Sequence, residues 1–426
     1  MRPNLQITNG HEHNFRPVPL TGVIYVMTEA RKFGYFDEPS EWVNFGQGQP
    51  EVGPLEHGPL RVTNIKVDEV TTEYAPVGGV WELRQAVADY YNRMYRKGMR
   101  SQYSAENVAI SPGGRSGLTR VIAALGQLNL GHFLPDYTAY EEILGAFRSF
   151  NPIPILLEPE RNYEFSLKEL RKEIAGRGLG ALLLSNPCNP TGKLICGEEL
   201  EGWVNVADNL DCALILDEFY SRYIWDSSLS YKQNPNVSAA EFVDDVNRSQ
   251  VIIIDGLTKN WRYPGWRISW TVGPKKIIES VASAGSFLDG GASHPIQQAA
   301  IPLLEQKHCE QESLAIQYAF KKKRKLLLQG IKDLGIEVEI EPGGTFYIWG
   351  NLSQLPEPMN NGKDFFELGL KNKLITVPGE FFDINPGRRR YGRPSRFRNH
   401  TRLSFGPSWD QVSLGLNRIK SMISGY

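Results

Sequence analysis

The stretch VIIIDGLTKNWRYPGWR (Val251–Arg267) joins a short apolar run to a segment with three basic side chains. The run VIIID is apolar except for its last residue, which is typical of a strand buried on both faces of a parallel sheet. Lys259 follows this run, and Arg267 comes eight positions after the lysine. In open α/β sheets, ligands bind beyond the carboxyl ends of the strands. The stretch therefore predicts a strand that presents an amine and a guanidinium to a ligand site.

Three more runs of this kind occur earlier in the chain: IPILL (Ile153–Leu157), ALLLS (Ala181–Ser185) and ALILD (Ala213–Asp217). Helix-length segments separate them, so the sequence predicts a doubly wound α/β domain with a mostly parallel sheet. NPCNPTG follows the second run, and EFY follows the third. If the strands are neighbours, an amide, a carboxylate, a phenol, an amine and a guanidinium meet at one sheet edge. These groups belong to Asn189, Asp217, Tyr220, Lys259 and Arg267.

The length of 426 residues exceeds the size at which one hydrophobic core usually stops growing, so two domains are expected. We predict a large α/β domain at residues 60–305. A smaller α+β domain would combine residues 1–59, which include an N-terminal arm, with residues 306–426. Apolar periodicity predicts helices at Val80–Tyr95 and Ala315–Leu334 and a short helix-like stretch around Val23–Phe33. After the second helix, IEVEIEP and FYIWGNL precede a final helix.

Composition and charge exclude several classes of protein. The 47 basic and 48 acidic side chains leave a net charge of -1, so no attraction to nucleic acid or to a membrane is expected. The four cysteines form no CxxC pair and have no histidine at ligand spacing, so no metal site is expected. The few cysteines, and the lack of a membrane-length apolar run or a secretion signal, predict a cytoplasmic protein.

One kind of cofactor would use this whole set of side chains. A lysine amine with a lowered pKa attacks a carbonyl, so Lys259 suits an aldehyde. A pyridine ring acting as an electron sink needs a carboxylate at its nitrogen and neutral donors at its phenolic oxygen. A phosphate needs backbone N–H groups at a helix N-terminus and a guanidinium. SPGGRSGL (Ser111–Leu118) is a candidate for that N-terminus, because Gly113 and Gly114 permit close approach.

The order of motifs points to a known family. Along the chain these motifs are NFGQGQPEVGP, YAPVGGVWELR, SPGGRSGL, PDYTAY, NPCNPTG, DEFY, TKNWRYPGWR, EPGGTFYIW and RLSF. From about Asn44 to its end, the chain resembles the class I/II aminotransferases of pyridoxal-phosphate (PLP) fold type I, the aspartate aminotransferase superfamily. The resemblance implies a mostly parallel seven-stranded sheet in a large domain and a smaller α+β domain. It also implies amino transfer from an L-amino acid to a 2-oxo acid by ping-pong chemistry, with pyridoxal 5′-phosphate as cofactor.

The resemblance assigns roles around the cofactor ring. Lys259 would link covalently to the cofactor aldehyde and then move a proton between the substrate α-carbon and the cofactor. Asp217 would pair with the ring nitrogen, and Asn189 and Tyr220 would donate hydrogen bonds to the ring oxygen. Tyr137 in PDYTAY would stack on the ring, where many relatives carry tryptophan.

Other roles concern the phosphate. Gly114, Arg115 and Arg267 would hold it, by resemblance to the family. Many relatives have a serine three residues before the lysine, where this chain has Gly256, so Thr258 is a candidate replacement for that contact. Arg115 stands where relatives often have Ser, Thr or Lys and would add positive charge near the phosphate.

The remaining roles concern the substrate and a second subunit. Arg402 in RLSF would bind the substrate α-carboxylate, helped by the backbone at Gly48 and by Asn189. Tyr74 in YAPVGG would reach the phosphate in a neighbouring subunit, which implies a homodimer with shared active sites.

Several alternatives stay open on the sequence alone. Asp217 is also compatible with a helix cap, Asn189 with a turn, Tyr137 with the core and Arg402 with the surface. A PLP-dependent lyase or cyclising synthase would keep the same cofactor residues. A PLP-fold regulator is disfavoured, because about forty residues before NFGQGQP are too few for a DNA-binding domain. The arginine-rich run at Pro386–His400 suits a solvated loop, a contact with an anionic substrate or an oligomer contact. The amino donor and keto acceptor are not readable.

Overall fold

The computed structural model describes residues 18–20, 22–225, 235–390 and 392–425. Its centre is a seven-stranded sheet of order β2-β8-β7-β6-β5-β3-β4, in which β8 runs antiparallel to both neighbours and the other pairs are parallel. The predicted mostly parallel sheet of seven strands is therefore confirmed. The strands are β2 (Val108–Ser111), β3 (Asn129–Leu134), β4 (Asn151–Leu156), β5 (Leu179–Ser185), β6 (Ala213–Asp217), β7 (Val251–Gly256) and β8 (Ser269–Val272).

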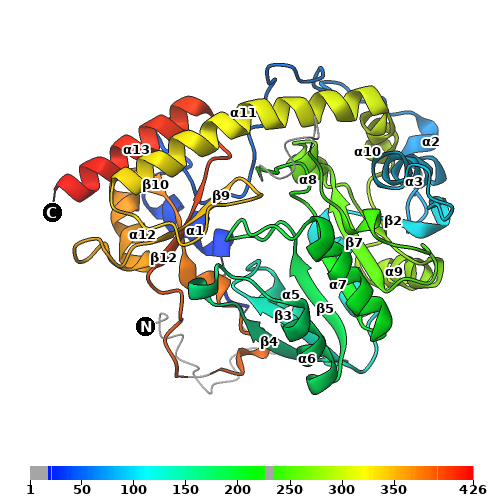
Figure 1. Cartoon of the computed structure of the whole chain (residues 1–426). Helices are drawn as coiled ribbons and strands as arrows, with labels where there is room; N and C mark the ends of the chain where they lie inside the picture. Colours follow the sequence, from blue (N-terminus) through cyan, green and yellow to red (C-terminus); the bar gives the residue numbers. More distant parts are fainter. Residues whose placement is uncertain (1–17, 21, 226–234, 391, 426) are drawn as a thin grey trace, which may run out of the picture.

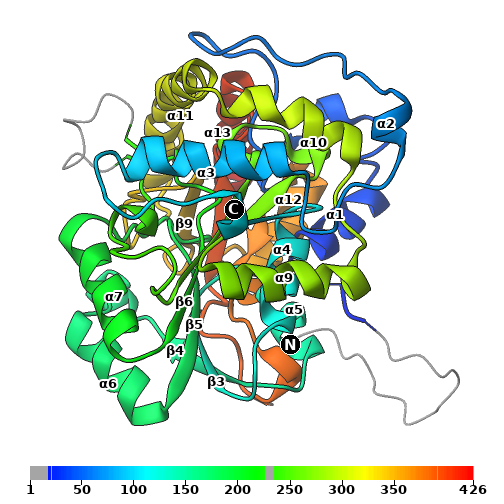
Figure 2. The ribbon, with the colours of Figure 1, turned by 90° about the vertical axis from the view of Figure 1, so that its right-hand side faces the viewer.

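Helices cover both faces of this sheet, as the apolar runs predict. Leu183 of β5 packs in the core on the side of α4 (Gly114–Ala123), α5 (Tyr140–Ala146) and α9 (Lys275–Leu288). Its neighbours Leu182 and Leu184 belong to the core on the side of α3 (Trp81–Tyr95), α6 (Leu167–Arg177) and α7 (Gly197–Asn209). Figure 2 shows α6 and α7 on one side of the sheet and α4, α5 and α9 on the other.

A second group of elements packs beside the carboxyl ends of the central strands. It contains an antiparallel sheet of order β11-β12-β9 and a parallel pair β1-β10. These strands are β1 (Val43–Asn44), β9 (Tyr347–Asn351), β10 (Leu374–Ile375), β11 (Val377–Pro378) and β12 (His400–Ser404). Its helices are α1 (Gly22–Lys32), α11 (Gln306–Asp333), α12 (Gly362–Lys371) and α13 (Trp409–Ser424). The short helices α2 (Glu69–Thr72), α8 (Leu257–Asn260) and α10 (His294–Ala300) complete the set of α-helices in the described residues.

Helix α11 is longer than the apolar pattern predicts. It begins at Gln306 rather than at Ala315, and it spans the upper edge of the molecule with α13 beside it (Figure 1). The additional turns bury a polar contact instead of an apolar stripe, because Glu312 is fully buried and accepts a hydrogen bond from Arg262 Nε at 2.5 Å. Hydrophobic periodicity alone therefore misses this part of the helix.

Two other expectations have different outcomes. IEVEIEP forms no strand beyond an isolated bridge between Glu337 and Asn351. The domain boundaries at 59/60 and 305/306 stay a prediction, and most of the N-terminal arm, residues 1–17, lies outside the described residues. Within the described ranges, no helix is both long enough and apolar enough to cross a membrane.

Candidate active site

A cavity of about 360 Å³ lies where β5, β6 and β7 end. Its walls include eleven of the twelve residues that the sequence analysis assigns to the site. They are Gly48, Gly114, Arg115, Tyr137, Asn189, Asp217, Tyr220, Thr258, Lys259, Arg267 and Arg402. The twelfth, Tyr74, is 99% exposed and does not line this cavity.

Lys259 enters the cavity from α8, the short helix that begins directly after β7. Its Nζ donates a hydrogen bond to the carbonyl oxygen of Gly48. Burial lowers the pKa of Lys259 to about 7, and the positive charges of Arg402, Arg267 and Arg115 act in the same direction. A large fraction of this amine is therefore neutral near pH 7, which is the state that attacks a carbonyl carbon.

Asp217 ends β6 and is buried. Its Oδ2 accepts a hydrogen bond from the Tyr140 hydroxyl at 3.0 Å, and its Oδ1 accepts the Phe219 N–H at 3.5 Å. Burial raises the pKa of Asp217 to about 6, and these hydrogen bonds and Lys259 oppose the rise. The carboxylate is therefore mostly ionised at neutral pH and can stabilise a protonated ring nitrogen. Sequence reasoning missed Tyr140, although it is the second tyrosine of the quoted PDYTAY motif.

Arg402 lies on β12 with 2% of its surface exposed, so it is not a surface arginine. Its Nη1 donates to Asn189 Oδ1 at 2.8 Å, and its Nη2 donates to the Gly46 carbonyl at 2.7 Å. The guanidinium carbon lies 4.1 Å from the centre of the Tyr347 ring. Among the described residues, Nε has no hydrogen-bond partner. This planar fork is held at the cavity wall, where it can bind a carboxylate.

Tyr220 and Tyr347 are joined by a hydrogen bond of 2.8 Å between their hydroxyl oxygens. Tyr347 also lies against the backbone of Gly48, where an added Cβ would be 2.5 Å from its hydroxyl oxygen. Tyr347 is a lining residue that sequence reasoning missed. It belongs to the EPGGTFYIW motif, but alternation along β9 does not reveal which side faces a ligand.

The other end of the cavity suits an anion. Gly113 has a φ of 90° and precedes the ten-residue helix α4, and a Cβ at this position would overlap the guanidinium of Arg267. A Cβ at Gly114 would overlap the ring of Phe219. The Thr258 hydroxyl is buried without a hydrogen-bond partner in the described part of the chain. Backbone N–H groups at a helix N-terminus, guanidinium groups and an unpartnered hydroxyl together fit a phosphate.

Tyr137 and Arg115 line the wall between the two ends. Arg115 Nε donates to the Tyr137 hydroxyl at 3.3 Å, and the Tyr137 ring meets the Tyr140 ring edge-on at 5.5 Å between centres. The cavity thus offers a group for each part of a phosphorylated pyridine aldehyde. It has an amine for the aldehyde, a carboxylate for the ring nitrogen, phenols for the ring oxygen, a turn for the phosphate and an aromatic wall for the ring.

Known proteins share both the sequence pattern and this fold. The family model for aminotransferase class I and II matches residues 40–411. Aspartate aminotransferase from Sulfurisphaera tokodaii is 25% identical over 393 residues, which cover 89% of this chain and 90% of that protein. LL-diaminopimelate aminotransferase from Halothermothrix orenii is 25% identical and covers 96% of each chain. The structure of aspartate aminotransferase from Thermus thermophilus with maleate matches with a TM-score of 0.76 at 23% identity, covering 96% of this chain and 97% of that one. The chain therefore belongs to the aminotransferase class I and II family, whose members depend on pyridoxal phosphate, and it is an aminotransferase.

Proposed function

We propose that the cavity binds pyridoxal 5′-phosphate and transfers the amino group of an L-amino acid to a 2-oxo acid. The observation that carries this proposal is the position of Lys259. Its amine, with a pKa lowered to about 7, faces the same cavity as the Asp217 carboxylate, the phosphate-binding turn and the buried fork of Arg402. An amine, a ring-nitrogen partner, an anion site and a carboxylate site in one cavity match the needs of amino transfer.

The residues divide the chemical work. When bound, pyridoxal phosphate supplies an aldehyde that condenses with amines and a ring that withdraws electrons from the α-carbon. Lys259 would provide the amine that holds the cofactor, and the freed amine would move a proton from the substrate α-carbon to the cofactor. Asp217, oriented by the Tyr140 hydroxyl, keeps the ring nitrogen protonated. Asn189 and Tyr220 offer hydrogen bonds to the ring oxygen.

Arg402 gives the substrate its orientation. Its contacts with Asn189, Gly46 and the Tyr347 ring hold the guanidinium plane before the substrate arrives. A carboxylate bound to that plane has one allowed rotation about the α-carbon, so the bond that breaks can be held perpendicular to the ring. Every amino acid has an α-carboxylate, which explains a fork at this position for the whole substrate class.

A half-reaction tests the proposal. Purified protein with bound pyridoxal phosphate is mixed with one amino acid at a time, and no 2-oxo acid is added. We expect stoichiometric conversion of the cofactor to pyridoxamine phosphate and one equivalent of 2-oxo acid. Lys259→Ala should retain weak cofactor binding through the phosphate contacts and lose both the covalent link and turnover. Continuous release of ammonia without an acceptor would instead support a lyase.

We also propose that the active enzyme is a homodimer. Leu60, Val67, Val70 and Tyr74 are 94%, 61%, 67% and 99% exposed, and Phe287 near the end of α9 is 71% exposed. Exposed apolar side chains in such number favour a protein partner, and a second copy of this chain is the partner that we propose. Light scattering should give twice the chain mass, and Leu60→Asp should shift the mass toward the monomer. A wild-type monomer with full activity would contradict the proposal.

A further inference from the structure

Asp136 is a buried carboxyl that the roles above do not use. It lies between β3 and α5, and 1% of its surface is exposed. Its Oδ1 accepts the Ser185 hydroxyl at 2.5 Å and the Tyr137 N–H at 2.7 Å, and its Oδ2 accepts the Ser185 N–H at 3.3 Å. Tyr137 and Ser185 both line the active-site cavity. The carboxyl therefore holds two segments of the cavity wall from behind.

Ser185 extends this contact toward the substrate. A serine hydroxyl has one proton, and here it is donated to Asp136, so the oxygen is free to accept. It accepts the N–H of Asn189 at 3.0 Å. Asn189 Oδ1 in turn accepts Arg402 Nη1 at 2.8 Å. Asp136 thus orients a hydroxyl that holds the Asn189 backbone, and Asn189 holds the guanidinium.

The second contact leads to the cofactor ring. The same Oδ1 atom holds the backbone N–H of Tyr137, whose side chain lies on the cavity wall. The Tyr137 hydroxyl is held separately by Arg115 Nε at 3.3 Å. The Asp136 carboxyl is therefore the point from which the ring-facing tyrosine and the substrate-facing asparagine are both positioned.

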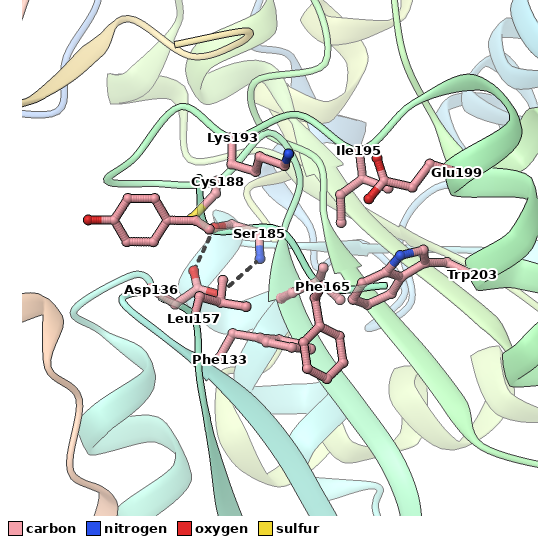
Figure 3. A pocket seen from close by; sticks show the side chains of 12 residues that line it. Phe133, Asp136, Leu157, Phe165, Ser185, Cys188, Lys193, Ile195, Glu199 and Trp203 are labelled. Atoms are coloured by element: carbon pink, nitrogen blue, oxygen red, sulfur yellow. Dashed lines mark hydrogen bonds between the residues drawn. The ribbon is translucent and has the colours of Figure 1, made fainter. Parts of the chain in front are cut away.

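The opposite side of Asp136 is apolar. A small cavity of about 30 Å³ is lined there mainly by apolar side chains, among them the rings of Phe133, Phe165 and Trp203, with Lys193 and Glu199 also in its wall. Figure 3 shows the two hydrogen bonds from Ser185 to Asp136, with Phe133 below Asp136 and Trp203 to the side. Burial raises the pKa of Asp136 to about 8, and the hydrogen bonds from Ser185 and Tyr137 oppose the rise. A neutral side chain would pack here at lower cost, so packing alone does not explain an acid at this position.

We propose that Asp136 is a positioning residue for amino transfer, which holds Tyr137 directly and Asn189 through Ser185. The proposal rests on the proposed function, because it requires a cofactor ring against the Tyr137 wall of the cavity and a substrate carboxylate on Arg402, which Asn189 holds. Displacing groups of this kind by a fraction of an ångström is enough to reduce turnover markedly.

Two variants separate the two contacts. Asp136→Ala removes both, and we expect it to shift the absorbance maximum of bound pyridoxal phosphate and to raise the KM of amino-acid donors by about tenfold or more. Ser185→Ala removes the hydroxyl that links Asp136 to Asn189 and leaves the Tyr137 N–H on Asp136 Oδ1, so KM should rise while the absorbance maximum stays unchanged. The matched control is Asp208→Ala, since Asp208 accepts the Ser249 hydroxyl at 3.0 Å and the Gln250 N–H at 2.6 Å at the start of β7, the opposite sheet edge. It should change neither quantity.

The result that overturns the proposal is a folded Asp136→Ala protein with the wild-type absorbance maximum and KM. If that variant does not fold, Asp136→Asn and Ser185→Ala decide. Asp136→Asn keeps the volume and the Oδ1 acceptor of the Ser185 hydroxyl and the Tyr137 N–H, and it loses only the longer contact of Oδ2 with the Ser185 N–H at 3.3 Å. It should therefore keep the absorbance maximum and hold KM within about threefold of the wild-type value. A folded Asp136→Asn variant that loses both, or a Ser185→Ala variant with unchanged KM, overturns the proposal. If the wild-type protein binds the cofactor but transfers no amino group, the proposed function fails, and the absorbance shift of Asp136→Ala still tests the positioning of Tyr137.

Discussion

Replacing Arg402 by lysine tests the substrate class most directly. The arginine is buried, its two Nη atoms are held at 2.8 Å and 2.7 Å, and its plane lies on the Tyr347 ring. Lysine keeps the positive charge but cannot form two parallel hydrogen bonds with a carboxylate. One hydrogen bond to a charged group contributes about 1.5–3 kcal/mol, so losing it should lower kcat/KM by about tenfold to a hundredfold. Misorientation at the α-carbon adds to this loss.

The assay compares two kinds of donor. We expect kcat/KM to fall for every amino acid, while an amine that lacks a carboxylate is almost unaffected. The dissociation constant of pyridoxal phosphate should remain near the wild-type value, because the phosphate contacts lie elsewhere. The control is Arg396→Lys, at an exposed arginine of the arginine-rich loop. It should leave kcat/KM unchanged for both kinds of donor. Equal losses for both kinds of donor would mean that Arg402 is structural, and the carboxylate site would then be sought among the arginines of 388–398 other than Arg396.

Three further predictions concern the cofactor side of the cavity. Asp217→Asn should fold normally and lower the steady-state kcat by well over tenfold, equivalent to more than about 1.4 kcal/mol of activation barrier. A smaller change in kcat would mean that another residue pairs with the ring nitrogen. Tyr140→Phe removes a hydrogen bond that lowers the Asp217 pKa, so the acidic limb of the pH–rate profile should move to higher pH; an unmoved limb would contradict this linkage. The rate at which apoprotein captures pyridoxal phosphate should rise with pH through about 7 and level off above it, because only the neutral amine of Lys259 attacks the aldehyde. Arg402→Gln removes a positive charge, so in this variant the rise should move to higher pH. A rate that does not change with pH would refute the lowered pKa of Lys259.

The sheet and its edge were predictable because the signals are local. The runs that became β5, β6 and β7 are apolar on both faces, and each is followed by polar side chains. Since parallel strands end at the same edge, the sequence alone assigns Asn189, Asp217 and Lys259 to one site. The family motifs extended this assignment to Arg402, which lies far away along the chain.

The sequence-based predictions were wrong for two segments, the start of α11 and IEVEIEP. The first turns of α11 bury Cys309 and Glu312, and the glutamate is matched by Arg262 from a different element. No periodicity of hydrophobic residues marks a helix whose inner face carries an ion pair. IEVEIEP alternates like a strand, but only Glu337 makes a bridge, because a strand also needs a partner.

Local sequence thus determined that the central strands β5, β6 and β7 form, which strand ends carry reactive side chains and which family the motifs resemble. Tertiary structure alone decided the contacts that give those side chains their properties. The lowered pKa of Lys259 depends on burial and on Arg402, whose position 143 residues further along the chain is no guide to its proximity. The hydrogen bonds from Tyr140 to Asp217 and from Ser185 to Asp136 likewise join residues that are 77 and 49 positions apart in the chain. Electrostatic and hydrogen-bond energies depend on distances and on exclusion of water, and both arise only when distant segments pack together.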